Sequence, residues 1–176
     1  PQNFIGIDGN AFLRPDLPNL SSGDRSLLYD QMNLGLANLH KVEPNKIGLK
    51  DFGRSGNYFS RQLSIWGHQY NLSKTEDISD VEILYDWLKN NLPSETEPSR
   101  LVHGDWRIDN LLFGKEQPIL SAILDREIST IGDARADLAN QLMQWAMPPG
   151  MEGRGLEGLD RTRLGIPSDS EYIEKY

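Results

Sequence analysis

The chain has 176 residues and no cysteine, and its 26 acidic against 18 basic side chains give a formal charge of −8. This length fits one domain of roughly 100–200 residues. The absence of cysteine excludes disulfides, thiolate zinc sites and cysteine nucleophiles, and it fits a reducing compartment, so we expect the cytoplasm. The acidic charge argues against general binding to nucleic acid or anionic membranes, and no apolar run is long enough to span a membrane.

The first twenty residues mix short apolar pieces with glycine and proline and predict a strand end followed by a loop. A serine at 21 or 22 can cap a helix that ends near Lys41. Its apolar face has nearly the helical period and comprises Leu28, Met32, Leu36 and Leu39. His40, at the end of this helix, and His68, in the next one, are expected in surface or capping positions.

Two more helices are predicted before residue 94. Apolar residues at i, i+4, i+7 and i+11 predict a helix with an aromatic stripe, which we expect in the core; they are Phe59, Leu63, Trp66 and Tyr70. Ser79, with Glu82 three residues later, predicts a capping box at the start of the next helix. That helix is expected to end at Pro93 and to bury Val81, Leu84, Tyr85, Leu88 and Leu92.

From Arg100 the pattern changes to short β-like runs at 101–102, 111–113 and 119–124. A helix is then predicted over 134–147, and Asp133 can cap it. A glycine-rich excursion follows over 151–164, and a last helix begins at Ser168, where Glu171 completes a second capping box. The expected fold class is therefore mainly α with short β-hairpins (α+β), the hairpins being set on a helical body.

The glycines of residues 153–158 match the pattern G-x-G-x-x-G that binds nucleotide phosphates. This pattern needs a preceding strand and a following helix, and here it follows two prolines and a glycine instead. We therefore interpret the segment as a loop near the substrate cleft.

Candidate chemistry gathers between residues 103 and 127. The spacing H-x-D-x-x-x-x-N, in which His103, Asp105 and Asn110 occur, lets an Asp face a substrate hydroxyl while the Asn five residues later faces a metal ion. Asp125, at the end of the next β-like run, completes a set of oxygen ligands suited to Mg²⁺. Residues 103–137 hold seven acidic and four basic side chains. A divalent ion would offset most of this charge and bridge phosphate oxygens.

The runs His103 to Phe113, Ile123 to Asp133 and Arg135 to Ala139 resemble the aminoglycoside phosphotransferase and choline kinase-like family. More narrowly, Gly56 to Tyr70, together with the short runs 148–150 and 164–167, resembles the branch found fused to or encoded near acyl-CoA dehydrogenases. The resemblance covers nearly the whole chain.

The resemblance implies that Asp105 is the catalytic residue that orients or deprotonates the acceptor hydroxyl. It implies Mg²⁺ and ATP as cofactors, with Asn110 and Asp125 as the metal ligands. Arg107 and Asp109, which lie between them, are expected to contact phosphate or substrate. The remaining three residues are expected to support the site: His103 orders the loop, Asp137 braces it from the next helix, and Glu127 lies beside Asp125.

The implied fold is the C-terminal lobe of a protein-kinase-like fold. Residues 1–10 would be the remnant of the hinge, and residues 11–176 the helical lobe, with its catalytic and metal-binding loops at 103–127. Kinases of this shape cover ATP with an N-terminal β-lobe that carries a phosphate-pairing lysine, and no such lobe precedes Pro1. We therefore expect little turnover from this chain alone, and self-association through an exposed interlobe surface.

Two positions depart from the family pattern: Arg126 stands where an aromatic residue is usual, and Ala134 where proline is common. The expected reaction is transfer of the ATP γ-phosphate to a small-molecule hydroxyl, either a hydroxyacyl-CoA-type metabolite or an aminoglycoside- or choline-like alcohol. One alternative is a non-catalytic binding module that has kept the kinase-like shape. The other is a metal-dependent hydrolase that uses His103, Asp105 and Asp125.

Overall fold

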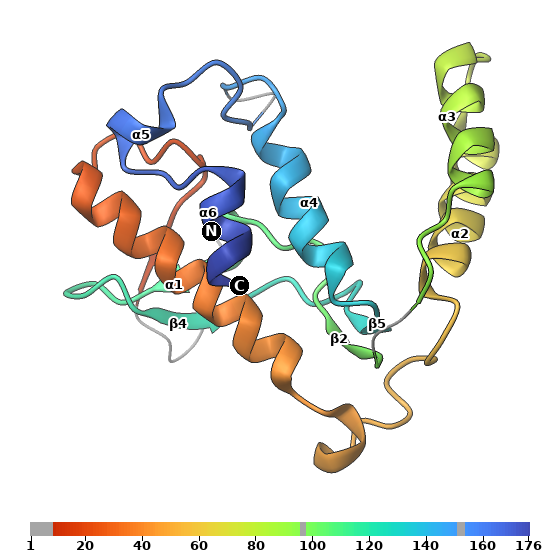
Figure 1. The fold of residues 1–176 in the computed structure, drawn as a ribbon, viewed down its shortest axis with the longest axis horizontal. Coiled ribbons are helices and arrows are strands. Elements are labelled where there is room, and N and C mark those ends of the chain that lie inside the picture. Colours follow the sequence, from red (N-terminus) through yellow and green to blue (C-terminus); the bar gives the residue numbers. More distant parts are fainter. Residues whose placement is uncertain (1–8, 96–97, 151–153) are drawn as a thin grey trace.

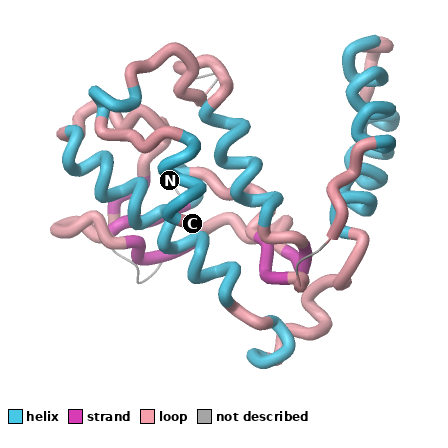
Figure 2. The backbone as a smooth tube through the Cα atoms, viewed as in Figure 1, coloured by secondary structure: helices cyan, strands magenta, loops and turns pink. Residues whose placement is uncertain are grey.

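The computed structural model describes residues 9–95, 98–150 and 154–176. A helical body surrounds two small antiparallel sheets, and a pair of helices stands apart from it (Figures 1 and 2). The predicted α+β class is confirmed. Most of the expected hinge, residues 1–8, and Gly153 of the glycine pattern lie outside the described residues. No helix in the described ranges is long and apolar enough to cross a membrane.

The first long helix, α1 (Ser22–Lys41), supplies the centre of the core. Ser21 caps it by accepting a hydrogen bond from the backbone N–H of Asp24. The predicted apolar face is confirmed, since Leu28, Met32 and Leu36 are buried and Leu39 is partly buried. Truncating one such leucine to alanine costs about 2–5 kcal/mol. α1 and its neighbours share one hydrophobic cluster, which includes Trp106, Leu111, Phe113, Trp145, Ile166 and Tyr172.

Two sheets carry the segment between residues 100 and 132. In the first, β3 (Leu111–Phe113) lies between β1 (Asn10–Ala11) and β4 (Leu120–Ile123). In the second, β2 (Arg100–Val102) pairs with β5 (Thr130–Gly132), a strand that the sequence pattern did not reveal. A short 3₁₀ turn, η2 (Ile108–Asn110), leads into β3. The loop between β2 and β3 is therefore anchored to a different sheet at each end.

Glycine sets how closely α1 approaches the first sheet. A Cβ atom on Gly35 would lie 2.2 Å from Cδ2 of Leu120 in β4, a separation that no real Cβ contact has. A larger residue at position 35 would therefore require the side chain of Leu120 to move. The contact brings the body of α1 up to the hairpin that ends at residue 123.

The pair of helices that stands apart consists of α2 (Tyr58–Ser73) and α3 (Ser79–Asn90) (Figure 1). The two pack on each other, and Gly67 makes room for the ring of Tyr85. The carboxylate of Glu95 closes the base of the pair, because it accepts hydrogen bonds from the backbone N–H groups of Asn57 and Tyr58.

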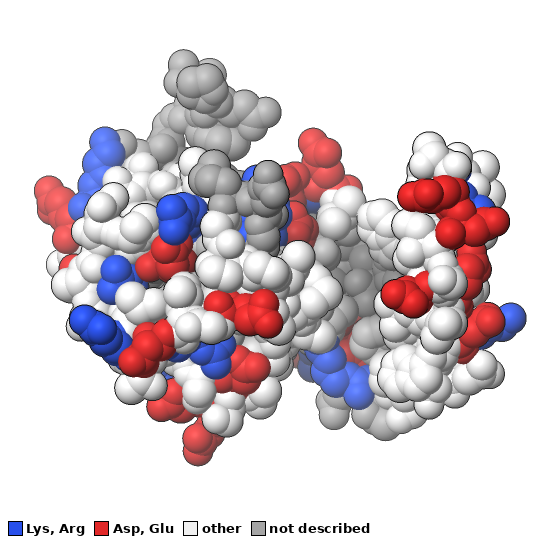
Figure 3. All heavy atoms as spheres, turned by 90° about the horizontal axis from the view of Figure 1, so that it is seen from above, with Lys and Arg blue, Asp and Glu red and all other residues white. Residues whose placement is uncertain are grey.

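Three expectations about this α2–α3 pair were wrong. The aromatic stripe of α2 is not core, since Trp66 is 60% exposed. α3 has no buried residue, and its N-cap is Ile78, without the predicted Ser79 capping box. An amphipathic stripe indicates burial only where a further layer covers it, and here each helix has only the other as a partner. Uncharged surface therefore covers much of the pair (Figure 3).

The C-terminal third returns to the body. A short helix, η1 (Pro44–Ile47), follows α1 earlier in the chain, and α4 (Arg135–Trp145) occupies the predicted 134–147 segment. α5 (Arg161–Leu164) lies within the expected loop, where its four residues are too few to show a period. α6 (Asp169–Lys175) begins with the predicted Ser168 and Glu171 capping box, which is confirmed. α6 contacts α1, since the side chain of Asn33 donates to the backbone carbonyl of Tyr172 at 2.7 Å.

Candidate active site

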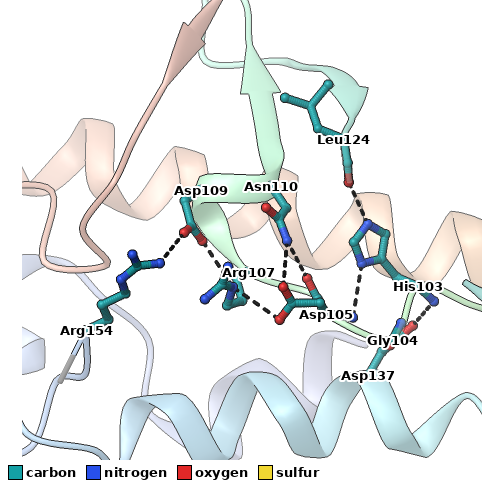
Figure 4. A network of polar contacts seen from close by, with 9 residues as sticks. All are labelled: His103, Gly104, Asp105, Arg107, Asp109, Asn110, Leu124, Asp137 and Arg154. Atoms are coloured by element: carbon teal, nitrogen blue, oxygen red, sulfur yellow. Dashed lines mark hydrogen bonds and ion pairs between the residues drawn. The ribbon is translucent and has the colours of Figure 1, made fainter. Parts of the chain in front are cut away.

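The loop from His103 to Asn110 is held by the imidazole of His103, which is 2% exposed. Its Nδ1 accepts a hydrogen bond from the backbone N–H of Asp105 at 3.2 Å. Its Nε2 therefore carries the proton and donates to the carbonyl of Leu124 at 2.8 Å. One buried ring thus ties the loop to the end of β4 (Figure 4). Both ring nitrogens are engaged, and neither is free to bind a metal.

Asp137, in the first turn of α4, braces the same loop from the other side. Its side chain is 1% exposed, and its two oxygens accept hydrogen bonds from the backbone N–H groups of His103 (2.7 Å) and Gly104 (2.8 Å). Gly104 has φ +90°, a conformation that favours glycine. The carboxylate therefore fixes the backbone immediately before Asp105.

Asp105 presents a carboxylate that is 30% exposed. The amide nitrogen of Asn110 donates to its Oδ2 at 3.1 Å and to its backbone carbonyl at 2.9 Å. Nε of Arg107 lies 3.2 Å from Oδ1 of Asp105 and 3.4 Å from Oδ1 of Asp109, without the alignment of a hydrogen bond. Asp105 is thus fixed in orientation by an amide on one side and a guanidinium on the other.

A cavity of about 590 Å³ opens beside these groups. Asp105, Arg107 and Asp109 line one wall, and Asn140 of α4 lines the wall opposite. Arg154 also reaches the cavity and pairs with Asp109 through a contact of 2.9 Å. Two carboxylates therefore face two guanidinium groups, and their charges offset one another.

One buried donor of this cavity has no acceptor. Nε of Arg107 is buried but ion-paired with Asp105 and Asp109. Nδ2 of Asn140 is also buried, and it has no hydrogen-bond partner among the described residues. Buried donors of this kind are rare, because leaving one unpaired costs about 1–3 kcal/mol. Arg154 belongs to the segment 153–158, which was expected as a loop near the substrate cleft, whereas Asn140 lies in α4 outside any motif and was not predicted to line the cavity.

Asp125 lies next to Asn110 through the backbone. The N–H of Leu124 donates to the carbonyl of Asn110 at 2.8 Å, and the carbonyl of Leu124 accepts from His103. Both peptide groups of the preceding residue are thus held. Asp125 itself has φ +55°, and its exposed carboxylate forms no hydrogen bond or ion pair with the described residues.

The neighbours of Asp125 are less constrained. Arg126 and Glu127 are exposed, and neither side chain has a hydrogen bond or an ion pair within the described ranges. Glu127 therefore makes no contact through which it would support the site. Arg126 is not paired with Glu127, so its charge remains beside Asp125.

The oxygen atoms of Asn110 and Asp125 are the predicted ligands of a magnesium ion. Across the described residues, no group of three or more His, Asp or Glu side chains is arranged to hold a metal. The predicted ligands are instead one amide and one carboxylate. Asn110 uses its amide nitrogen on Asp105, which leaves Oδ1 without a hydrogen-bond partner, and Asp125 has an unpaired carboxylate. Two hard oxygens fit Mg²⁺, which usually keeps several waters and takes one or two protein carboxylates.

Burial and nearby charged groups shift the pKa values of three residues around the loop. The side chain of Arg135 lowers the pKa of Asp133, whose carboxylate also accepts the backbone N–H of Arg135 at 3.0 Å and so serves the start of α4. Burial raises the pKa of Tyr58 to about 12, and the nearby Asp137 carboxylate adds to the rise. Burial and the same carboxylate also raise the pKa of Tyr176.

His40 is the residue that sequence reasoning placed wrongly. It is 5% exposed, and its Nε2 lies 3.0 Å from Oδ2 of Asp137. The helical pattern put it at a helix end, where a surface position is usual. Its partner lies 97 residues away, so no local signal marked the contact. His68 is exposed, as expected.

Several solved structures share this fold. A presumed aminoglycoside phosphotransferase from Ralstonia eutropha is 41% identical, with a TM-score of 0.92, over 97% of this chain and 52% of its own. A type VIII aminoglycoside-3'-phosphotransferase has a TM-score of 0.65 at 16% identity, over 96% of this chain and 58% of its own, and so shares the fold. A 2″-aminoglycoside phosphotransferase solved with streptomycin and ATP has a TM-score of 0.58 at 18% identity, over 96% and 55%.

Curated relatives carry a different name. The chain is 38% identical to acyl-CoA dehydrogenase family member 10 of Mus musculus, over 96% of this chain and 16% of that protein. It is 35% identical to the probable acyl-CoA dehydrogenase IBR3 of Arabidopsis thaliana, over 97% of this chain and 22% of that protein. The chain thus spans about a fifth of these relatives, and they fit the branch expected from the sequence. Residues 4–162 match the model of the phosphotransferase enzyme family. The chain belongs to the phosphotransferase enzyme family.

Proposed function

We propose that this chain carries the acceptor and metal-binding side of a kinase that transfers the ATP γ-phosphate to a small-molecule hydroxyl. One observation carries the proposal: Asp105 lines a large cavity and is held there by the amide of Asn110, whose backbone carbonyl accepts the N–H of Leu124 directly before Asp125. Phosphoryl transfer depends mainly on positioning and on offsetting charge.

In the proposed reaction, Asp105 accepts a hydrogen bond from the acceptor hydroxyl and takes its proton as the new phosphorus–oxygen bond forms and the bond between the γ-phosphorus and the leaving ADP breaks. Asn110 keeps the carboxylate in orientation, and Arg107 can turn from Asp105 toward a phosphate oxygen. Asn110 and Asp125 would hold Mg²⁺, which supplies charge neutralisation for the phosphates when it is bound. The chain spans about half of the solved Ralstonia eutropha protein. In the proposed kinase, other parts of the whole protein would make the remaining contacts to the nucleotide.

The cavity favours one of the acceptor classes considered. A ligand carbonyl or thioester oxygen would satisfy the unpaired Nδ2 donor of Asn140, whereas an ammonium group would not. Met143 and Met147 line the same cavity and offer apolar surface to an aliphatic chain. We therefore favour a hydroxyacyl-type acceptor, and the relatives named as acyl-CoA dehydrogenases agree with it.

The first test is phosphoryl transfer by the protein at its natural length, with a hydroxyacyl-CoA, choline and an aminoglycoside as acceptors. Asp105→Asn should lower kcat by about 10²–10⁴-fold and leave the KM for ATP nearly unchanged. Glu116→Gln, which changes an exposed carboxylate in the β3–β4 turn, is the matched control. An Asp105→Asn protein with unchanged kcat would refute the assignment.

The second test separates a kinase from a non-catalytic binding module, the alternative that Arg126 beside the metal site favours. ATP binding is measured by calorimetry with and without Mg²⁺, for the natural protein and for Asp125→Asn. A kinase should bind ATP more tightly with Mg²⁺, and Asp125→Asn should remove most of this dependence. Binding without metal dependence would favour the module. The hydrolase alternative has little support, because His103 has no free ring nitrogen.

A further inference from the structure

A chain of hydrogen bonds joins α1, α4 and the residue after α6 behind the catalytic loop; its His40–Asp137 link is buried. His40, near the end of α1, lies between Asp137 of α4 and Tyr176, which follows α6. Its Nε2 is 3.0 Å from Oδ2 of Asp137, and its Nδ1 is 2.5 Å from the Tyr176 hydroxyl oxygen. The rings of His40 and Tyr176 meet edge to face, with centroids 5.7 Å apart.

The partners determine the direction of these hydrogen bonds. The carboxylate of Asp137 only accepts, so Nε2 of His40 carries a proton and donates to it. Nδ1 of His40 is then an acceptor, and the hydroxyl of Tyr176 donates to it. Burial keeps that hydroxyl protonated, because it raises the pKa of Tyr176. The donors thus run from Tyr176 through His40 to Asp137.

Asp137 has three donors among the described residues, and two of them belong to the catalytic loop. The N–H groups of His103 and Gly104 bind it at 2.7 and 2.8 Å, next to Asp105. His40 is the third, and it fixes the rotation of the carboxylate from behind. A side chain that is 1% exposed and carries charge needs each of its donors.

We propose that His40 is a positioning residue for Asp105, that it acts through Asp137, and that the hydroxyl of Tyr176 holds its ring. The inference rests on the proposed function, because it concerns the loop that would perform it. α6 is itself docked on α1, since Asn33 binds the carbonyl of Tyr172 and Lys175 pairs with Asp30. The end of α6 is therefore coupled to the geometry of the catalytic loop.

The test compares His40→Leu with two matched variants. His40→Gln can place an amide nitrogen where Nε2 donates, and Leu36→Ala truncates a buried residue one turn earlier in the same helix without touching the polar chain. The first readout is the amide proton resonances of His103 and Gly104. In His40→Leu they should move toward their positions in Asp137→Asn, whereas Leu36→Ala should leave them in place.

The second readout is phosphoryl transfer by the protein at its natural length. His40→Leu should lower kcat about 10-fold at nearly constant KM for ATP, because small displacements of a catalytic group cost rate more than binding. His40→Gln should recover most of that loss. If His40→Leu does not fold, Tyr176→Phe, which removes one hydroxyl, should shift the same two resonances by a smaller amount.

The two readouts fail separately. Unchanged His103 and Gly104 resonances in His40→Leu and Tyr176→Phe would overturn the positioning role, whether or not the protein is active. Shifted resonances in a protein that transfers no phosphoryl group would support the coupling and remove the proposed function. Equal losses of kcat in His40→Leu and Leu36→Ala, without recovery in His40→Gln, would also overturn it, because only stability would then be at work.

Discussion

Replacing Asp137 with asparagine should weaken the whole domain as well as its catalytic loop. The carboxylate accepts three hydrogen bonds while 1% exposed. Asparagine keeps one acceptor oxygen, which can serve the two donors on the Oδ2 side, His103 and His40. Its NH₂ group then faces the N–H of Gly104, and two donors cannot bind each other. One charge-assisted hydrogen bond, worth about 1.5–3 kcal/mol, is lost, and a buried N–H is left unpaired.

Together these losses come to about 3 kcal/mol. The measurement is urea unfolding followed by circular dichroism. With a slope of about 2 kcal/mol per molar urea, the midpoint should fall by about 1.5 M. Asp30→Asn is the control, since it breaks the exposed pair with Lys175 and should cost under about 1 kcal/mol. Equal costs for the two variants would refute the reasoning.

Three further results are expected. Gly104→Ala should destabilise the chain more than Gly48→Ala. Both residues have positive φ, but only Gly104 has atoms within 4 Å of the added Cβ. Urea unfolding measures the loss of stability in each variant, and equal losses would exclude crowding at Gly104 as the cause. The pKa of Asp133 is lowered mainly by the side chain of Arg135. The stability that this interaction contributes is fully present above the unfolded-state pKa of about 4, and it is lost as pH falls through the folded-state pKa. Asp133→Asn should therefore flatten the acid side of the stability profile. Finally, we expect the exposed apolar side chains of the α2–α3 pair to drive self-association. Replacing the exposed Trp66 and Trp87 with glutamine should reduce it, as measured by sedimentation velocity. A monomer at all concentrations would contradict this expectation.

Local patterns predicted several elements of the fold correctly. The face of α1, the capping box of α6 and strand β3 each depend on neighbours within a few residues, which periodicity and cap chemistry describe. The placement of Asp105 and Asn110 in one loop also depends only on nearby sequence. Five residues separate them, and their side chains meet there. The roles assigned to them, and to Asp125 as a metal ligand, remain predictions.

The amino-acid sequence by itself determined where the longer helices and strand β3 form and which side chains can do chemistry, because those properties depend on spacing along the chain. Only the tertiary structure decided that the stripes of α2 and α3 stay exposed, and that His40 is buried against a carboxylate 97 residues away. It also decided that Asn140 and Arg154 reach the cavity of Asp105. Such contacts depend on how whole elements pack, and the free energy of burial depends on what lies opposite, which no local pattern contains.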